Sequence, residues 1–250
     1  MRPADTTMSP LLEVRELGRR FGGLVALSGV SFDVRAGSIV GIMGANGAGK
    51  TTLFSLIAGN QRPTTGDIRV EGRSVIGLRA DQVCRLGVAR TFQIVMPFPS
   101  LTVLENVRTG AMFGAAGLRD RTAADAAARA VIEEIGLAEM ADQPASTLTL
   151  SGQKRLEVAR AVATGARLVL LDEVMAGLTP VEVQQMLATL RRIQATRGLT
   201  LLVIEHVMRA LMDLCSRIIV LHHGELIAQG SPQEIGDNPK VLAAYFGAKT

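Results

Sequence analysis

The chain has 250 residues, a length that can bury one sizeable core without disulfides or a structural metal. Its two cysteines, Cys84 and Cys215, lack C-x-x-C spacing, which argues against a zinc or disulfide framework and fits a reducing cytoplasm. The net charge of +4 is spread over many segments and aromatic residues make up only 3%, so no nucleic-acid partner is expected. The sequence contains neither a secretory leader nor a run of about 18 apolar residues, so it is not expected to span a membrane by itself.

The N-terminal part begins with ten residues that are predicted to be flexible. Residues 11–38 then alternate apolar and polar side chains between glycines, a pattern typical of antiparallel strands with one face on the core. The continuous apolar run "SIVGIMG" (38–44) instead predicts a strand that is buried on both faces, and a helical pattern follows it. A small antiparallel sheet beside a parallel one is therefore expected.

Residues 95–165 are rich in alanine, helical in pattern and without strand-like runs, which predicts an inserted helical subdomain. Within it, Thr122 and Asp125 form a candidate capping box at a helix start, and Thr179 with Glu182 forms a second one farther along. The second box has a proline at the first helical position. The helix that it begins carries apolar residues at helical spacing: Val183, Met186, Leu187, Leu190 and Ile193.

Three more apolar runs of strand length lie in the C-terminal half: "RLVLLDE" (167–173), "TLLVIEH" (200–206) and "RIIVLHHG" (217–224). The last one and the following "GELIAQG" predict a hairpin around Gly224. Because buried strands alternate with helices, the pattern predicts an α/β fold with a mostly parallel sheet.

A glycine-rich segment between the first buried strand and its helix fits G-x-x-x-x-G-K-[ST] in full. Glycines there allow close backbone approach to phosphates, the lysine adds a positive charge, and the hydroxyl after it can bind Mg²⁺. The alternative is a plain glycine-rich turn, which the strand and helix context disfavours. The predicted P-loop contacts to ATP come from Gly44, Ala45, Asn46, Gly47, Ala48, Gly49, Lys50, Thr51 and Thr52.

Polar residues follow two other predicted strands, at the sheet edge where open α/β sheets bind ligands. Asp172 is the expected metal partner together with Thr51, and Glu173 is free to act on the attacking water. His206 ends another buried strand and is expected to face the same crevice, although a lone histidine is often a core residue. His222 and His223 are interpreted as hairpin residues.

Taken together, the P-loop, the Asp-Glu pair and the later histidine resemble the ATP-binding cassette (ABC) transporter ATPases over nearly the whole chain. The resemblance implies a RecA-like P-loop NTPase core at 11–94 and 166–250 with a helical subdomain at about 95–165. It also implies that Phe21 stacks on adenine and that Gln93 contacts Mg²⁺ and the membrane partner. The segment "LTVLENV" (101–107) resembles the part that follows that glutamine, near where the membrane subunit docks.

Shorter strings, among them "GVARTFQ", "VIEHVM" and "NPKVLAAYFG", look most like the ATPase subunits of branched-chain amino acid uptake systems, with amide and urea systems sharing much of the wording. Two positions depart from the family pattern. Val174 follows Glu173 where proline is common, and Thr179 stands in "AGLTP" where aspartate or asparagine is usual. Neither change removes a catalytic group.

The family signature L-S-G-G-Q has a variant form in "LTLSGQKRLEVARA" (148–161). Counting back from Arg160 places its five positions on residues 148–152. Matching by residue identity places "LSGQ" on 150–153 with one glycine missing. Under either alignment a hydroxyl and a glycine stand at a helix start, and Ser151 and Gly152 are the expected contacts to the γ-phosphate that the opposite subunit binds.

The resemblance implies a peripheral ATPase on the cytoplasmic face of the inner membrane, where it binds Mg-ATP between two ATPase subunits of the same or a related chain. Its other expected partners are integral membrane permease subunits and, indirectly, an extracytoplasmic solute-binding protein. Catalysis is expected from Glu173, His206 and Lys50. Two alternatives remain, an ABC-type ATPase without a membrane partner and a P-loop kinase; the second leaves the Ser-Gly helix and His206 without a role.

Overall fold

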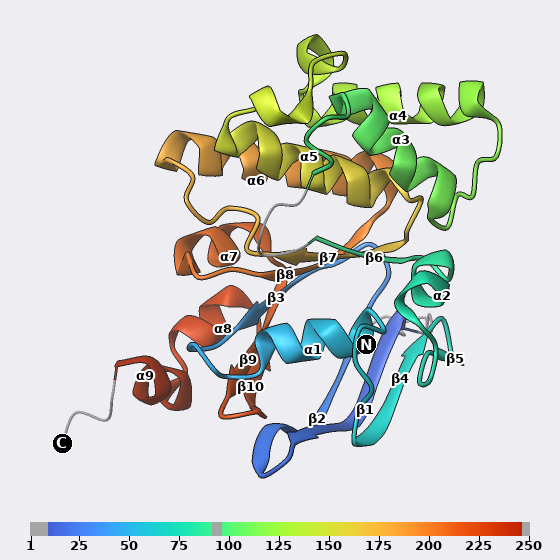
Figure 1. Cartoon of the computed structure of the whole chain (residues 1–250). Helices are drawn as coiled ribbons and strands as arrows, with labels where there is room; N and C mark the ends of the chain where they lie inside the picture. The colour runs from blue at the N-terminus through green and yellow to red at the C-terminus, as the bar shows by residue number, and fades with distance from the viewer. Residues whose placement is uncertain (1–9, 92–96, 247–250) are drawn as a thin grey trace, which may run out of the picture.

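The computed structural model describes residues 10–91 and 97–246. Two sheets organise the molecule (Figure 1). The smaller one has the strand order β2-β1-β4-β5, and all its pairs are antiparallel. Its strands are β1 (Leu12–Phe21), β2 (Leu24–Val34), β4 (Thr65–Val70) and β5 (Arg73–Ser74). The antiparallel sheet that the alternating N-terminal segment predicts is therefore confirmed.

The larger sheet has the strand order β10-β9-β3-β8-β7-β6. Every pair in it is parallel except β9 with β10, which form a hairpin around Gly224. The strands are β3 (Ile39–Met43), β6 (Val88–Arg90), β7 (Leu168–Asp172), β8 (Thr200–Ile204), β9 (Arg217–His222) and β10 (Glu225–Gly230). The strand runs of the C-terminal half are confirmed, as is the place of His222 and His223 at the hairpin, whereas the short β6 was not predicted.

Each central strand of the larger sheet is buried on both faces, and successive side chains enter different cores. In β7, for example, Val169 and Leu171 belong to one core and Leu168 and Leu170 to the other. This explains why the strands read as continuous apolar runs. It also leaves the strand ends as the places where polar side chains can stand.

Helices cover both faces of the larger sheet (Figure 1). One face carries a layer of α3 (Val103–Phe113), α4 (Arg121–Ile135), α5 (Leu150–Ala163) and α6 (Pro180–Arg197). On the other face, α1 (Lys50–Ile57) lies between the two sheets. Shorter helices complete the described chain: α2 (Ala80–Arg85), α7 (Met208–Leu214), α8 (Pro232–Gly236), α9 (Pro239–Phe246) and the 3₁₀ turns Ala138–Met140 and Ala145–Thr147.

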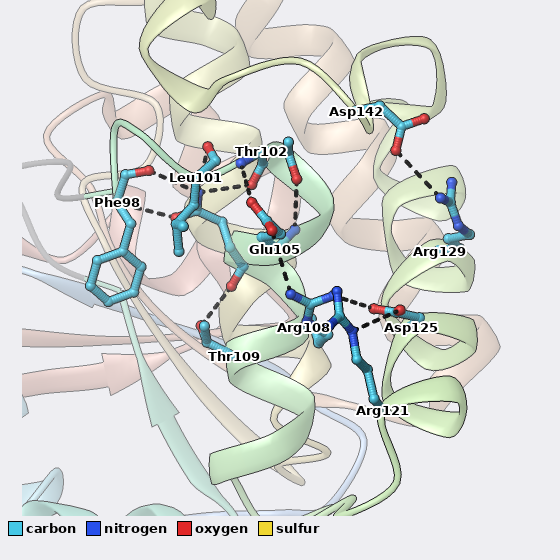
Figure 2. Close-up of polar contacts among 11 residues, drawn as sticks. Phe98, Leu101, Thr102, Glu105, Arg108, Thr109, Arg121, Asp125, Arg129 and Asp142 are labelled. Carbon is cyan, nitrogen blue, oxygen red and sulfur yellow. Dashed lines mark hydrogen bonds and ion pairs between the residues drawn. The ribbon is translucent and has the colours of Figure 1, made fainter.

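The predicted capping box at Thr122 and Asp125 is wrong. Asp120 caps α4, because its carboxylate accepts a hydrogen bond from the N–H of Ala123 at 2.8 Å. Thr122 already lies inside the first turn, and Asp125 accepts from Arg108 of α3 at 2.9 Å, as Figure 2 shows. A carboxylate one turn into the helix is thus used to join α4 to α3 instead of capping.

The second capping box is confirmed. Thr179 accepts from the N–H of Glu182, and Glu182 accepts in return from the N–H of Thr179, with Pro180 at the first helical position of α6. The apolar positions expected on this helix pack into the core of the helical layer. Threonine therefore keeps the capping function that aspartate or asparagine, which are at least as good N-caps, would supply at this position.

None of the described helices combines the length with the apolar composition that a membrane span requires. Between residues 97 and 165 the described chain is helical without a strand of either sheet. The division into a core at 11–94 and 166–250 and a helical subdomain at about 95–165 stays a prediction.

We predict that Asp120→Ala lowers the free energy of unfolding by about 1 kcal/mol, because it removes the side-chain acceptor at the start of α4. Thr122→Ala is the matched control and changes it by only a few tenths of a kcal/mol, because alanine suits an exposed helix interior at least as well. Urea unfolding of both variants measures the difference. Equal losses in the two variants would contradict the assignment of the cap.

Candidate nucleotide site

The glycine-rich loop connects the end of β3 to the start of α1. Gly47 and Gly49 have φ angles of 80° and 100°, which only glycine adopts readily. A Cβ on Gly44 would lie 2.5 Å from the carbonyl oxygen of Leu221, and one on Gly49 would lie 2.6 Å from that of Ala26. The loop can therefore keep this close course only with glycines. It presents the exposed residues Ala45, Asn46, Gly47 and Thr51 to solvent, with Thr52 half-buried behind them.

Lys50 is the buried cation of this loop. Its ammonium group donates hydrogen bonds to the carbonyl oxygens of Gly44 and Ala45, at 2.7 and 3.0 Å. Burial lowers the pKa of Lys50, and the negative charges of Glu173 and Asp172 act in the opposite direction. This electrostatic coupling indicates that the P-loop lysine lies near the two carboxylates at the end of β7.

Asp172 ends β7 and is almost fully buried. Its Oδ2 accepts from the Arg90 guanidinium at 2.8 Å, and its N–H donates to Thr91 Oγ1 at 2.9 Å. The other carboxylate oxygen, Oδ1, is buried and has no hydrogen-bond partner among the described residues. Such an oxygen suits a hard cation or its bound water, so the site fits Mg²⁺. Sequence reasoning missed Arg90, because a single arginine in a three-residue strand carries no motif.

Glu173 and His206 meet after the ends of β7 and β8. Glu173 Oε1 lies 2.7 Å from His206 Nε2. Glu173 has a φ of 53°, a left-handed backbone that costs a non-glycine residue about 1–3 kcal/mol and that recurs at functional sites. The Glu173 side chain is buried and the His206 side chain is half-exposed, so the pair extends from the protein interior to its surface. The histidine is thus not a core residue.

Two further charged side chains, Lys154 and Glu205, lie behind this pair and were missed by sequence reasoning. Lys154 Nζ donates to the carbonyl oxygen of Glu173 at 3.0 Å, and Glu205 Oε1 accepts from the N–H of Met175 at 2.7 Å. Both side chains are buried. A charged residue next to a predicted site residue, as Glu205 is to His206, was the available signal.

Two other residues that the sequence predicts to contact the nucleotide or Mg²⁺ are Phe21 and Gln93. Phe21 lies at the end of β1, is 41% exposed and has the Arg19 guanidinium over one ring face at 4.4 Å. The β2 strand that follows it reaches the P-loop, since Ala26 and Leu27 lie against Gly49. Gln93 lies outside the described residues.

The helix α5 begins inside the variant signature. Its N-cap is Thr149, whose hydroxyl accepts from the N–H of Gly152 at 3.3 Å. Thr149 and Leu150 are exposed, whereas Ser151 and Gly152 are buried in the first turn. The pKa of the Glu182 carboxyl in the α6 capping box is lowered chiefly by hydrogen bonds from Thr179, with a smaller contribution from the nearby Ser151 hydroxyl. The hydroxyl at the exposed helix start is therefore that of Thr149.

A groove of about 630 Å³ lies between the six-stranded sheet and the helical layer, lined among others by Phe98, Phe113 and Arg160. Asn106, fully buried in α3, shapes its edge by accepting from the N–H of Phe98 and donating to the carbonyl oxygens of Phe98, Leu101 and Thr102. Figure 2 shows how these bonds gather the segment 98–102 against the start of α3. Phe98 is thereby held at the surface, with Arg160 over its ring at 5.1 Å.

A glycine loop at a helix N-terminus, a buried lysine and paired acidic residues beyond parallel strands define a P-loop nucleotide-binding protein. A family model described as ABC transporter matches residues 27–176, which is more than half of the chain. The chain belongs to the ABC transporter family. It is an ATP-binding subunit of such a transporter, an ATPase whose hydrolysis of ATP is coupled to transport. A second model, described as branched-chain amino acid ATP-binding cassette transporter, matches residues 225–249.

Relatives and solved structures agree with this assignment. The high-affinity branched-chain amino acid transport ATP-binding protein BraF of Pseudomonas aeruginosa is 39% identical, with 95% of this chain and 98% of that protein covered. The corresponding LivG protein of Salmonella typhimurium is 40% identical with the same coverage. A crystal structure of a nucleotide-free ATP-binding cassette from an ABC transporter superposes with a TM-score of 0.86 at 26% identity, covering 95% of this chain and 99% of that one.

Stability of the folded chain is predicted to depend on the protonation of Glu205. Burial raises the pKa of Glu205 to about 7, above its ordinary value of 4.5, because desolvation penalises the carboxylate. The folded protein therefore holds a proton that the unfolded chain releases above about pH 4.5. The resulting stability is complete below about pH 4.5 and is lost as the pH rises through about 7.

Urea unfolding between pH 5 and 8 tests this dependence against Glu205→Gln, which keeps an acceptor oxygen but cannot ionise. The wild type should lose roughly 3 kcal/mol relative to the variant over this range. A difference between the two proteins that does not change with pH would contradict it.

Proposed function

We propose that the chain is the ATP-hydrolysing subunit of an uptake transporter for branched-chain amino acids or related small polar solutes. The observation that carries the hydrolytic part is the 2.7 Å contact between Glu173 and His206, beside a P-loop lysine that is electrostatically coupled to Glu173. The names of the relatives and the C-terminal family match support the solute class. The relatives named above are all transport subunits, which gives no support to an ATPase without a membrane partner.

In this proposal the P-loop amides and Lys50 hold the ATP phosphates, with Phe21 against the adenine. Thr51, Asp172 and Gln93 would hold Mg²⁺, which would neutralise phosphate charge. The buried, unpartnered Oδ1 of Asp172 supports that assignment. In the described part of the chain, no three His, Cys, Asp or Glu side chains group as a metal cage.

Glu173 acts as the general base on the attacking water, and His206 orients that carboxylate and faces the γ-phosphate. Two observations support these roles. The carboxylate is held by the imidazole, and it is buried where a base is shielded from bulk solvent. Lys50 stabilises the negative charge that develops on the transferred phosphoryl group.

A second ATPase subunit, the same or a related chain, completes each nucleotide site with the N-terminus of its α5. The exposed Thr149 hydroxyl at the N-terminus of α5 suits a γ-phosphate, since the helix dipole favours anions there. Ser151 and Gly152, the contacts expected from the sequence, support the same turn from its buried side.

Integral membrane permease subunits are the proposed docking partners, and the groove beside Phe98 supports this. Its lining is mostly apolar and includes the charged residues Arg160 and Glu157, so it suits a short amphipathic segment. The subunit would then lie at the cytoplasmic face of the inner membrane and act indirectly with an extracytoplasmic solute-binding protein. Nucleic acid has no part in this function.

The proposal predicts that Glu173→Gln keeps Mg-ATP binding but lowers hydrolysis by about 10²- to 10⁴-fold, because the base is lost while the P-loop is unchanged. Equilibrium binding of a fluorescent ATP analogue and phosphate release measure the two effects. Glu225→Gln on exposed β10 is the matched control. Wild-type turnover by the Glu173→Gln protein would refute the assignment.

Transport itself is tested in cells that lack the chain and are complemented with the wild type or with Glu173→Gln. Uptake of labelled leucine, isoleucine and valine is the measurement.

A second prediction concerns the variant signature. In the Glu173→Gln background, where ATP persists, light scattering should detect a Mg-ATP-dependent dimer, and a monomer with bound ATP would indicate a related but different partner. Thr149→Val should weaken the nucleotide-dependent assembly about tenfold by removing a hydroxyl that contacts phosphate. Ser151→Ala should affect it far less, because that hydroxyl is buried against α6. Equal effects, or a larger effect of Ser151→Ala, would indicate that Ser151 makes the contact to the γ-phosphate.

A further inference from the structure

Lys154 and Glu205 are buried polar side chains that the reaction described above does not use. Lys154 comes from α5 and Glu205 follows β8, and they are only 3% and 4% exposed. Lys154 donates to the carbonyl oxygen of Glu173, and Glu205 accepts from the N–H of Met175. Together they hold the chain on both sides of Val174, which is itself fully buried.

The segment that they hold begins with a backbone conformation that the sequence does not favour. Glu173 is left-handed, with φ at 53°. A residue other than glycine keeps such a backbone conformation only where the surrounding structure fixes it. Here the N–H of Glu173 donates to the carbonyl oxygen of Ile204 at 2.9 Å, and its own carbonyl oxygen accepts from Lys154 and from the N–H of Ala176.

The direction of this turn decides where the Glu173 carboxylate points. The carboxylate stands 2.7 Å from His206 only while the backbone at residue 173 keeps its course. Lys154 and Glu205 are also coupled to each other, because the Lys154 charge acts on the Glu205 carboxyl inside the protein. Removing one of them therefore changes the electrostatic environment of the other.

We propose that Lys154 and Glu205 are positioning residues for ATP hydrolysis, which hold residues 173–175 in the left-handed turn that aims the Glu173 carboxylate. The inference rests on the proposed function, in which Glu173 is the general base. It has a second consequence, because Lys154 belongs to the helix that begins at Thr149. The base of one nucleotide site is thereby fastened to the helix that serves the other site.

The test uses the full chain and centres on the double variant Lys154→Met/Glu205→Leu. Removing both groups together leaves no lone buried charge, and such exchanges for apolar residues of similar size are often tolerated by the fold. The expected result is a kcat lowered by about 100-fold with a KM for Mg-ATP within about twofold of wild type, since a small misplacement of a reacting group suffices for such a loss. Lys240→Met, on the exposed surface of α9, removes the same charge and should leave both constants unchanged.

Two conservative variants separate positioning from a merely structural role. Lys154→Arg keeps a donor and a charge, and Glu205→Gln keeps an acceptor for the Met175 N–H. Each should retain a higher kcat than its apolar counterpart, Lys154→Met or Glu205→Leu, when both are assayed at a temperature at which each is fully folded. Wild-type kcat in the folded double variant, with only the melting temperature lowered, would overturn the proposal.

A crystal structure of the double variant gives a readout that does not depend on turnover. Glu173 should return to a negative φ and its carboxylate should leave His206. An unchanged φ with the 2.7 Å contact preserved would overturn the positioning role. Full activity of Glu173→Gln would instead refute the proposed function, while this structural comparison would still decide what holds the turn.

Discussion

Burial of the central strands on both faces is the constraint on which the rest of the molecule depends. A strand such as β7 or β8 has no solvent-facing side, so it can carry only apolar side chains along its length. Polar chemistry is then confined to the points where the strands end. Because β3, β7 and β8 run in parallel, these points fall on one edge, and Lys50, Asp172 and His206 converge there.

Electrostatics at this edge depends on compensation among buried charges. Asp172 accepts from Arg90 at 2.8 Å, and Glu173 lies 2.7 Å from His206. Lys154 donates to the carbonyl oxygen of Glu173, and its charge also acts on Glu205. An ion pair buried in this way is a weak source of stability, since desolvation offsets most of the attraction. At this edge such contacts instead fix the orientation of the side chains, because each partner restricts the position of the other.

The sequence could predict those parts of fold and site that follow from periodicity or from a complete motif. The buried strands, the hairpin and the P-loop are of this kind, as is the Thr179 cap, where threonine, proline and glutamate stand at fixed spacing. Asp120 was missed because Thr122 three residues before Asp125 offered an equally plausible local pattern, and only the packing of Arg108 from α3 decides between them. Arg90, Lys154 and Glu205 depend on contacts over long sequence separations, which no local pattern encodes.

The sheet also separates two cores that share few side chains. The nucleotide loop and α1 belong to the core on one face, whereas the helices α3 to α5 belong to the core on the other. A substitution in the helical layer therefore reaches the phosphate-binding loop through the strand backbones or through a side chain at the strand ends, as Lys154 does at Glu173. In evolutionary terms, the outward face of the helical layer can diverge without changing the packing around the phosphate-binding loop.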